Sequence, residues 1–305
     1  MVEKWELERE DERFPKMLDE ELVTATKLYG LGNPDALQGP CISVIGARRA
    51  TPYGLAIAQM AGRVAAESGI TVVSGGAMGC DFAASRAALD AGGRTVIVAG
   101  NGADRIYPPS SADVFHEAVE KDGAILSIEP WGTSPNKYTF PKRNVIIAAL
   151  SPVLLVCEAG ERSGTMSTCD AALEMDRKIY AIPGSIFSPS SQGTNRLVRD
   201  GAVPIASEVE LETQLAMDYG VLRVVGDGMP GDVGEVVSAL IASPARPEEL
   251  APRLGQTVLT LLRTLTDFEA RGIVEHLPDG RYSLTASSYQ QYRTGDLAKS
   301  VAGAE

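Results

Sequence analysis

The chain has 305 residues and a formal net charge of −12, with 28 lysines and arginines against 40 aspartates and glutamates. This length accommodates one large and one small domain, each with a hydrophobic core of its own. No apolar run reaches the roughly 18 residues that a membrane helix requires, and the acidic N-terminus lacks the pattern of a signal peptide. We therefore expect a cytoplasmic protein with no membrane segment.

Residues 1–40 form a charged lead-in segment that we expect to pack on the core. From Cys41 onward, short apolar strands alternate with helical segments. The predicted strands are 41–46, 71–76, 95–100, 124–129, 153–159, 178–184 and 202–207. The predicted helices end near Glu67 and Ala91 and then cover 112–121, 143–150, 165–176 and 192–200. This alternation predicts an α/β fold, a doubly wound and mostly parallel sheet over residues 41–218.

The pattern changes after residue 218. Residues 219–231 are rich in glycine and form a predicted linker. Residues 232–286 contain three helical segments followed by a hairpin signal, an order typical of a winged-helix-like domain. Because this domain is acidic, we favour a protein-contact or packing role over DNA binding for it. Residues 287–305 are predicted to be a flexible tail.

The acidic charge is unevenly distributed along the chain. Residues 1–40 carry 5 basic and 10 acidic side chains, residues 41–205 carry 15 of each, and residues 206–305 carry 8 and 15. The centre is therefore neutral while both flanks are acidic. A strand of phosphates would need a local cationic groove in the centre, because the field of the whole molecule repels it.

Glycine and polar residues gather where the predicted strands end. Four such turns are GARR (46–49), SGG (74–76), GNG (100–102) and SGT (163–165). The carboxyl ends of parallel strands form one edge, where glycine allows backbone amides to approach an anion and the following helices supply positive ends. Together with Arg48 and Arg143, these turns predict a phosphate-lined groove. No Walker A sequence is present, and the GxGxxG spacing of a dinucleotide fold is missing after the first strand, where GARRATPYG stands.

Catalytic and metal-binding patterns are weak in this sequence. The four cysteines are widely spaced without a CxxC pair, and neither histidine accompanies a candidate nucleophile. Carboxylates that follow predicted strands are candidate acids or bases, although the usual role of aspartate in such turns is to cap them. These carboxylates are Asp81, Asp104, Glu129 and Glu158. We expect reduced cysteines, no cofactor, no metal and no enzymatic activity.

Six motifs, in order along the chain, carry a family resemblance. They are ISVIGARRATPYG (42–54), VVSGGAMGCD (72–81), GNGADRIYPP (100–109), FPKRNVIIAALS (140–151), EAGERSGTMST (158–168) and IPGSIFSPSSQGTNRLVRDGA (182–202). On these motifs the chain resembles the bacterial DNA-processing protein A family, also called Smf, over about residues 14–210. A winged-helix-like C-terminal domain is also common in that family.

The resemblance implies an extended Rossmann-like fold that binds single-stranded DNA in a cationic pocket. It further implies a homodimer that protects incoming DNA and loads the recombinase RecA onto it during natural transformation. Arg48 and Arg143 would be phosphate ligands, and Phe140 is a candidate platform for base stacking, with a role as core anchor as the alternative. The implied DNA contacts are Gly46, Arg48, Ser74, Gly75, Gly76, Lys137, Phe140, Lys142, Arg143, Asn144, Ser163, Gly164 and Thr165.

The chain departs from the family pattern at three places. Cys80 replaces the isoleucine of a glycine-isoleucine-aspartate turn, and Ser85-Arg86 stands where a histidine is usual. Val145 stands where a second arginine commonly follows the FPxRN asparagine. The lost cation predicts weaker and more salt-sensitive DNA binding, and whether Arg86 replaces it is left open.

Two other functions remain open at this point. The first is a nucleotide-cleaving enzyme of the lysine-decarboxylase-like group, for which a PGGxGT motif is expected. Residues 163–165 lack the preceding Pro-Gly-Gly. The second is a sensor that binds a small nucleotide and signals through the winged-helix-like domain.

Overall fold

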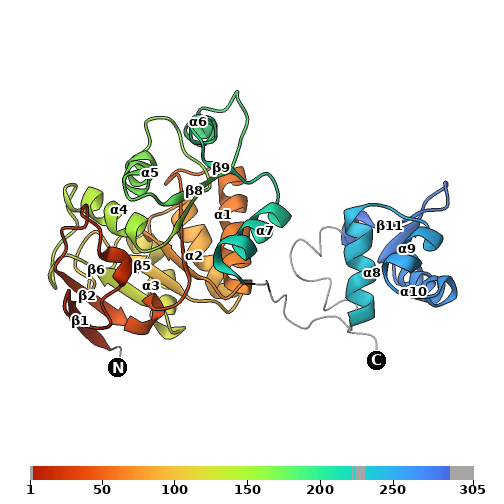
Figure 1. Cartoon of the computed structure of the whole chain (residues 1–305), viewed down its shortest axis with the longest axis horizontal. Helices are drawn as coiled ribbons and strands as arrows, with labels where there is room; N and C mark the ends of the chain where they lie inside the picture. The colour runs from red at the N-terminus through yellow and green to blue at the C-terminus, as the bar shows by residue number, and fades with distance from the viewer. Residues whose placement is uncertain (1–2, 222, 224–230, 289–305) are drawn as a thin grey trace. The chain divides into compact units, whose positions relative to one another are not determined.

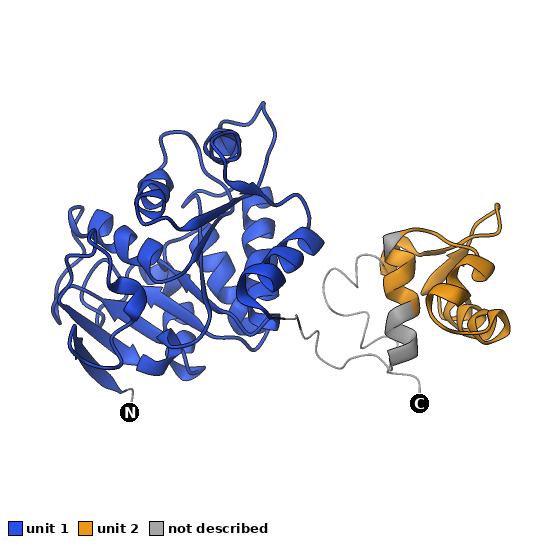
Figure 2. Ribbon diagram, viewed as in Figure 1, with its two compact units in different colours: residues 1–224 blue, residues 225–305 orange. Residues whose placement is uncertain are grey.

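A computed structural model of the chain describes residues 3–221, 223 and 231–288. The chain divides into two compact units, residues 1–224 and 225–305 (Figures 1 and 2). Most of the predicted linker and almost all of the predicted tail lie outside the described residues. In the part of the chain that is described, no helix is both long and apolar enough to cross a membrane.

The first unit is built on one nine-stranded sheet, with the strand order β1-β2-β6-β5-β4-β3-β7-β8-β9. Its strands are β1 (Lys4–Glu8), β2 (Lys27–Gly32), β3 (Cys41–Ile45), β4 (Thr71–Ser74), β5 (Thr95–Val98), β6 (Ala124–Ser127), β7 (Val153–Val156), β8 (Lys178–Ala181) and β9 (Val203–Pro204). The strands from β6 to β9 in this order pair in parallel, while β1 and β2 pair antiparallel at one edge. The predicted α/β class with a mostly parallel sheet is confirmed.

Helices cover both faces of this sheet (Figure 1). They are α1 (Pro52–Glu67), α2 (Cys80–Asp90), α3 (Ala112–Glu120), α4 (Thr139–Ala149), α5 (Gly164–Glu174), α6 (Gln192–Arg199) and α7 (Glu208–Tyr219). Side chains alternate along each strand, so that Val44 packs in the core under α1 and α2 while Ile45 packs in the core under α4 and α5. All four cysteines are buried as free thiols.

The strand order reverses next to β3. From β3 the chain proceeds outward through β4, β5 and β6, and α4 then returns it to β7 on the other side of β3. Adjacent loops therefore diverge at the carboxyl ends of β3 and β7. Open α/β sheets bind their ligands at such a point.

Residues 1–40 contribute two strands that the sequence analysis did not predict. In β1 the residues alternate between exposed and buried, and Trp5 covers Gly30 of β2 so closely that a Cβ there would lie 2.0 Å from the indole ring. The Trp5 Nε1 donates a hydrogen bond to the Gly32 carbonyl at 2.9 Å. This lead-in segment thus extends the sheet beyond β6.

Helix α4 begins at Thr139, four residues before the predicted start at residue 143. Pro141 lies in the first turn, where its missing N–H removes no helical hydrogen bond. Thr139 also fixes the start of the helix, because its Oγ1 donates to the Gly100 carbonyl. The earlier start places Arg143 inside the helix, with its side chain buried.

The second unit contains α8 (Gly231–Ala242), α9 (Pro247–Arg253), α10 (Val258–Ala270) and a hairpin of β10 (Val274–His276) and β11 (Tyr282–Leu284). Its core includes Leu250, Leu261, Leu265 and Phe268. Three helices and a hairpin follow one another in the order that the sequence predicted.

Replacing Trp5 by alanine should lower the free energy of unfolding by about 3–5 kcal/mol, because a buried indole and its hydrogen bond are lost. Urea unfolding of the full chain, followed by circular dichroism, measures this change. The matched control is Trp131→Ala, since the half-buried Trp131 stacks edge-on against Tyr29 at 5.6 Å near the sheet edge. Equal losses in the two variants would contradict the role given to β1.

Candidate nucleic-acid interface

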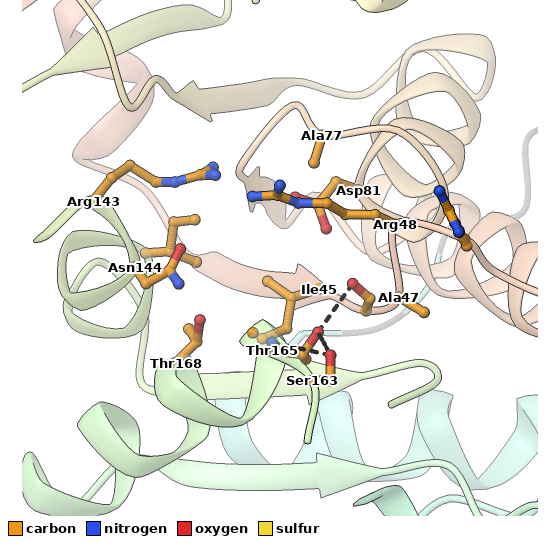
Figure 3. Close-up of a pocket in the computed structure, with 14 residues that line it drawn as sticks. Ile45, Ala47, Arg48, Ala77, Asp81, Arg143, Asn144, Ser163, Thr165 and Thr168 are labelled. Atoms are coloured by element: carbon orange, nitrogen blue, oxygen red, sulfur yellow. Dashed lines mark hydrogen bonds between the residues drawn. The ribbon is translucent and has the colours of Figure 1, made fainter. Parts of the chain in front are cut away.

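A cavity of about 450 Å³ opens at the carboxyl ends of β3, β4 and β7, where the strand order reverses (Figure 3). Residues from the loop after β3, from α4 and from the start of α5 line it. Seven of the DNA contacts implied by the sequence are among them: Gly46, Arg48, Arg143, Asn144, Ser163, Gly164 and Thr165. The fold thus brings together residues that are more than a hundred positions apart.

Arg143 is the most buried cation of the site, with 3% of the residue exposed. Its Nη1 donates to the Val98 carbonyl at 3.0 Å, whereas its Nε has no hydrogen-bond partner among the described residues. Burial, together with the positive charge of Arg48, lowers the pKa of Arg143 to about 10. The guanidinium therefore stays charged at neutral pH and retains unused donor capacity.

The two arginines face each other across the cavity. Figure 3 shows the guanidinium groups of Arg48 and Arg143 pointing toward one another from the loop after β3 and from α4. Arg48 is exposed, in contrast to Arg143. Two like charges held in this way repel each other, so an anion placed between them is attracted by both.

Asp81 is the buried carboxylate nearest to this pair. It accepts a hydrogen bond from the Gly75 amide at 3.2 Å, and burial raises its pKa although the charge of Arg143 opposes this shift. Gly75 leaves room for both groups, because a Cβ at that position would lie 1.7 Å from the Arg143 Nη1 and 2.7 Å from the Asp81 Oδ2. The glycine therefore serves the placement of the guanidinium.

Phe140 lies at the start of α4, half-buried, and contacts both arginines. The Cζ atoms of Arg48 and Arg143 are 5.5 Å and 5.7 Å from its ring centroid, within the range of cation–π attraction. On its other side the ring packs so closely on Gly100 that a Cβ there would lie 2.6 Å from it. The ring anchors α4 and also orients the two cations.

The start of α5 forms the opposite wall. Ser163 caps the helix, since its Oγ accepts the Thr165 amide at 3.2 Å and donates to the Thr165 hydroxyl at 2.9 Å. That hydroxyl donates in turn to the Gly46 carbonyl at 3.1 Å. The positive end of the α5 dipole is thereby fixed against the loop after β3.

The other implied contacts lie away from the cavity lining. Ser74 is buried and its Oγ donates to the Val44 carbonyl at 2.7 Å. Gly76 has φ of +66°, and a Cβ there would lie 2.6 Å from a neighbouring aromatic ring. Lys137 is exposed just before α4, and Lys142 is exposed near the start of that helix. Ser74 and Gly76 thus have local structural roles, and the two lysines lie on the surface.

A buried glutamate next to the cavity was not singled out for this role by the sequence. Glu158 accepts hydrogen bonds from the Thr51 amide (2.8 Å), the Thr51 hydroxyl (2.7 Å) and the Ser190 hydroxyl (2.7 Å). A Cβ at Gly54 would lie 2.4 Å from its Oε2. The carboxylate therefore fills the N-terminus of α1. Its position directly after an apolar strand was the only sequence signal.

The two departures at Val145 and Arg86 have separate explanations. Val145 packs against the core under α4 and α5. Arg86 donates to Glu117 and pairs with Asp90 at 2.7 Å, on the surface formed by α2 and α3. Arg86 is thus held by two carboxylates outside the cavity, and it does not replace the cation that Val145 removes.

The part of the chain that matches known proteins contains the cavity. Residues 6–216 match the family described as DNA recombination-mediator protein A. Protein Smf of Synechocystis sp. is 34% identical over 232 residues, which cover 73% of this chain and 57% of that protein. The chain thus spans little more than half the length of that relative.

Two solved structures have similar folds. An X-ray structure of DNA processing protein A from Streptococcus pneumoniae aligns with a TM-score of 0.65 and 33% identity, over 70% of this chain and 74% of that one. DNA processing protein A from Helicobacter pylori, whose structure concerns its single-stranded DNA binding mode, aligns with a TM-score of 0.64 and 31% identity, over 71% and 97%. These matches confirm the resemblance inferred from the six motifs.

The Arg86 cluster makes a pH-dependent contribution to stability. The hydrogen bond from Arg86, followed by that from Lys121, lowers the pKa of Glu117 to about 2 from its usual 4.5. A lowered carboxyl pKa stabilises the fold above the usual value, and this contribution is lost as the pH falls toward 2. Arg86→Ala should therefore reduce the free energy of unfolding by about 1 kcal/mol or less at pH 7.

The free energy of unfolding of Arg86→Ala should approach that of the unchanged chain as the pH falls from about 4.5 toward 2. This is the range set by the pKa shift of Glu117. Urea unfolding at a series of pH values measures it. Arg94→Ala is the control, because Arg94 only reaches Asp122 at 3.7 Å. A difference that is independent of pH would contradict the assignment.

Proposed function

This chain belongs to the DNA recombination-mediator protein A family, and from that membership we propose that it binds single-stranded DNA as a recombination mediator. In this proposal it protects incoming DNA and loads the recombinase RecA onto it during natural transformation. It acts in the cytoplasm as a homodimer. The single-stranded DNA binding mode described for the Helicobacter pylori protein supports the choice of ligand.

One observation carries the proposal. The buried guanidinium of Arg143 and the exposed one of Arg48 point into a cavity whose opposite wall is the N-terminus of α5. Guanidinium groups and helix amides bind phosphate oxygens, because both supply charged or dipolar N–H donors. Contacts of this kind follow the backbone of a nucleic acid and do not distinguish one base from another.

The aromatic ring between the arginines adds a second type of contact. Phe140 is half-buried, so part of its surface is open to a base, and stacking on such a ring is worth ~1–3 kcal/mol per base. Lys137 and Lys142 lie on the same helix start or just before it, where they would meet the neighbouring phosphates. We infer a site that tolerates sequence and favours single strands, whose bases are free to stack.

We propose no catalytic role. Glu158, the carboxylate closest to a strand end of the site, is engaged by three hydrogen bonds from Thr51 and Ser190. Asp81 is buried against Gly75, and its raised pKa has burial as its first cause. Asp81 lines the cavity with 7% of the residue exposed, and Glu158 is not part of the lining. The alternative function, a small-nucleotide sensor, would be supported if mononucleotides raised the melting temperature of the protein and oligonucleotides did not.

Arg48→Ala should raise the Kd for a fluorescently labelled oligo-dT about tenfold at fixed salt, because one charged contact is lost. The slope of log Kd against log salt should fall by about 0.7, the amount per neutralised phosphate of a single strand. Arg143→Ala should weaken binding more strongly, since Arg143 also orients Phe140. Fluorescence anisotropy across a salt series measures both quantities.

Arg94→Ala is the matched control, because it removes the same charge directly before β5, at the amino end of the parallel strands. Circular dichroism checks that Arg143→Ala remains folded, and Arg143→Lys retains the charge without the planar fork. Undiminished binding in Arg48→Ala and in the folded Arg143 variants would exclude this site, as would an affinity that does not respond to salt.

A further inference from the structure

The loop between β8 and α6 covers residues 182–191 (Figure 1). It presents two large apolar side chains to solvent. Ile186 is 78% exposed and Phe187 is 89% exposed, the highest value for a large hydrophobic residue in the described part of the chain. The motif IPGSIFSPSSQGTN contains both, and the DNA contacts proposed above include neither. An aromatic side chain held in water is a candidate contact surface.

Hydrogen bonds hold this loop in one conformation. The Gly184 amide donates to the Asn195 Oδ1 at 3.0 Å, and the Asn195 Nδ2 donates back to the Gly184 carbonyl at 3.0 Å. Within the loop, Ser185 accepts the Phe187 amide on its Oγ (3.2 Å) and the Ser188 amide on its carbonyl (3.0 Å). Phe187 therefore stands at the tip of a fixed turn.

The same loop is hydrogen-bonded to two segments that lead into the lining of the cationic cavity. Ser190 donates to Glu158, which also binds Thr51, two residues beyond the cavity-lining Arg49. On the other side the Gly193 amide donates to the Ala159 carbonyl at 2.8 Å, in the segment that leads to Ser163. The Tyr53 hydroxyl reaches the Pro183 carbonyl at 2.8 Å. The base of the loop is thus attached next to the segments that carry Arg49 and Ser163 of the lining.

The charge pattern of this loop does not repel an anionic chain. Residues 177–199 contain no aspartate or glutamate, in a chain with 40 such residues among 305. The basic residues of this stretch pair with Glu20, Asp218 and Asp200, so they leave little free positive charge at the tip. An anion is therefore tolerated there, and the attraction must come from the aromatic face.

We propose that Phe187 stacks on a base of the DNA strand where that strand leaves the cationic cavity. The DNA site then extends from Arg48 and Arg143 along the loop to its tip. Its neighbours in the loop are polar, with serines at positions 185, 188 and 190, and such a setting suits a nucleotide better than the apolar surface of a protein partner. This inference rests on the proposed function, because it assigns one further contact to the same ligand.

The test compares full-length variants on labelled oligo-dT of about 6 and about 16 nucleotides, within the range of known single-strand site sizes. Phe187→Ala should raise the Kd for the long oligonucleotide about 5- to 100-fold, the loss expected for one stacked base. The short oligonucleotide, held by the cavity, should bind unchanged. Phe187→Trp should retain affinity, and its added fluorescence should be quenched by the long oligonucleotide.

Two controls separate stacking from other effects. Phe187→Leu keeps an apolar side chain without a π-face and should behave like Phe187→Ala. Met217→Ala removes another exposed apolar side chain, 72% exposed on α7, and should leave the Kd for both oligonucleotides unchanged.

Several outcomes would overturn the inference. Phe187→Ala could bind the long oligonucleotide as tightly as the unchanged chain, or bind both lengths equally more weakly. Phe187→Leu could retain full affinity. Light scattering could show that Phe187→Ala has a different molecular mass from the unchanged chain, which would identify a contact between copies. Weakened binding in Arg48→Ala together with unchanged binding in Phe187→Ala leaves the proposed function intact and removes only this extension. Absence of binding in the unchanged chain removes the proposed function itself.

Discussion

The burial of one guanidinium group organises the candidate site. Moving a charge out of water is costly unless hydrogen bonds and opposite charges replace the lost hydration. Arg143 receives only part of this replacement, from the Val98 carbonyl, the nearby carboxylate of Asp81 and the ring of Phe140. Burial is the largest cause of the lowered pKa of Arg143 and of the raised pKa of Asp81.

It follows that the pair of Arg143 and Asp81 contributes little to the stability of the fold, since desolvation penalises the charged forms of both partners. Its features make sense if a phosphate completes the arrangement. The Arg143 Nε has no partner in the described structure, and the facing charge of Arg48 is a further penalty that an anion would relieve. Gly75 shows how tightly the position is set, because a Cβ there would lie 1.7 Å from the guanidinium.

A second carboxylate explains why the anion site lies here and not at α1. In dinucleotide-binding sheets the first helix directs its positive end at a pyrophosphate. In this chain Glu158 supplies an internal anion at that place, held by Thr51 and Ser190 and fitted against Gly54. The N-terminus of α1 is thus neutralised from within. The cationic elements that remain around the cavity include the start of α5 and the two facing arginines.

The sequence could predict what depends on local pattern. The alternation of apolar runs and helices was sufficient for the sheet, and the polar strand ends, with Arg48 and Arg143, were sufficient for the cavity. It could not predict β1 and β2, because β2 pairs with β6, about ninety residues further along the chain. The alternating charges of β1 also resemble those of a solvated segment.

Glycine-rich turns were the least reliable signal for individual contacts. Ser74 and Gly76 belong to such a turn, yet one bonds to β3 and the other avoids an aromatic ring, so both serve packing. The role of Glu158 depends on Thr51 and Ser190, which approach it from distant parts of the chain. No local pattern contains that information.

The net charge of −12 does not oppose a DNA site at this edge of the sheet. Three stretches without acidic residues, 36–66, 130–157 and 177–199, contain β3, β7 and β8, which are neighbours in the sheet. Carboxylates are therefore sparse across these strands, and the two close to the cavity, Asp81 and Glu158, are both buried. At physiological ionic strength charges act over a Debye length of about 8 Å. The local composition, and not the acidic flanks, then sets the potential that a phosphate meets in the cavity.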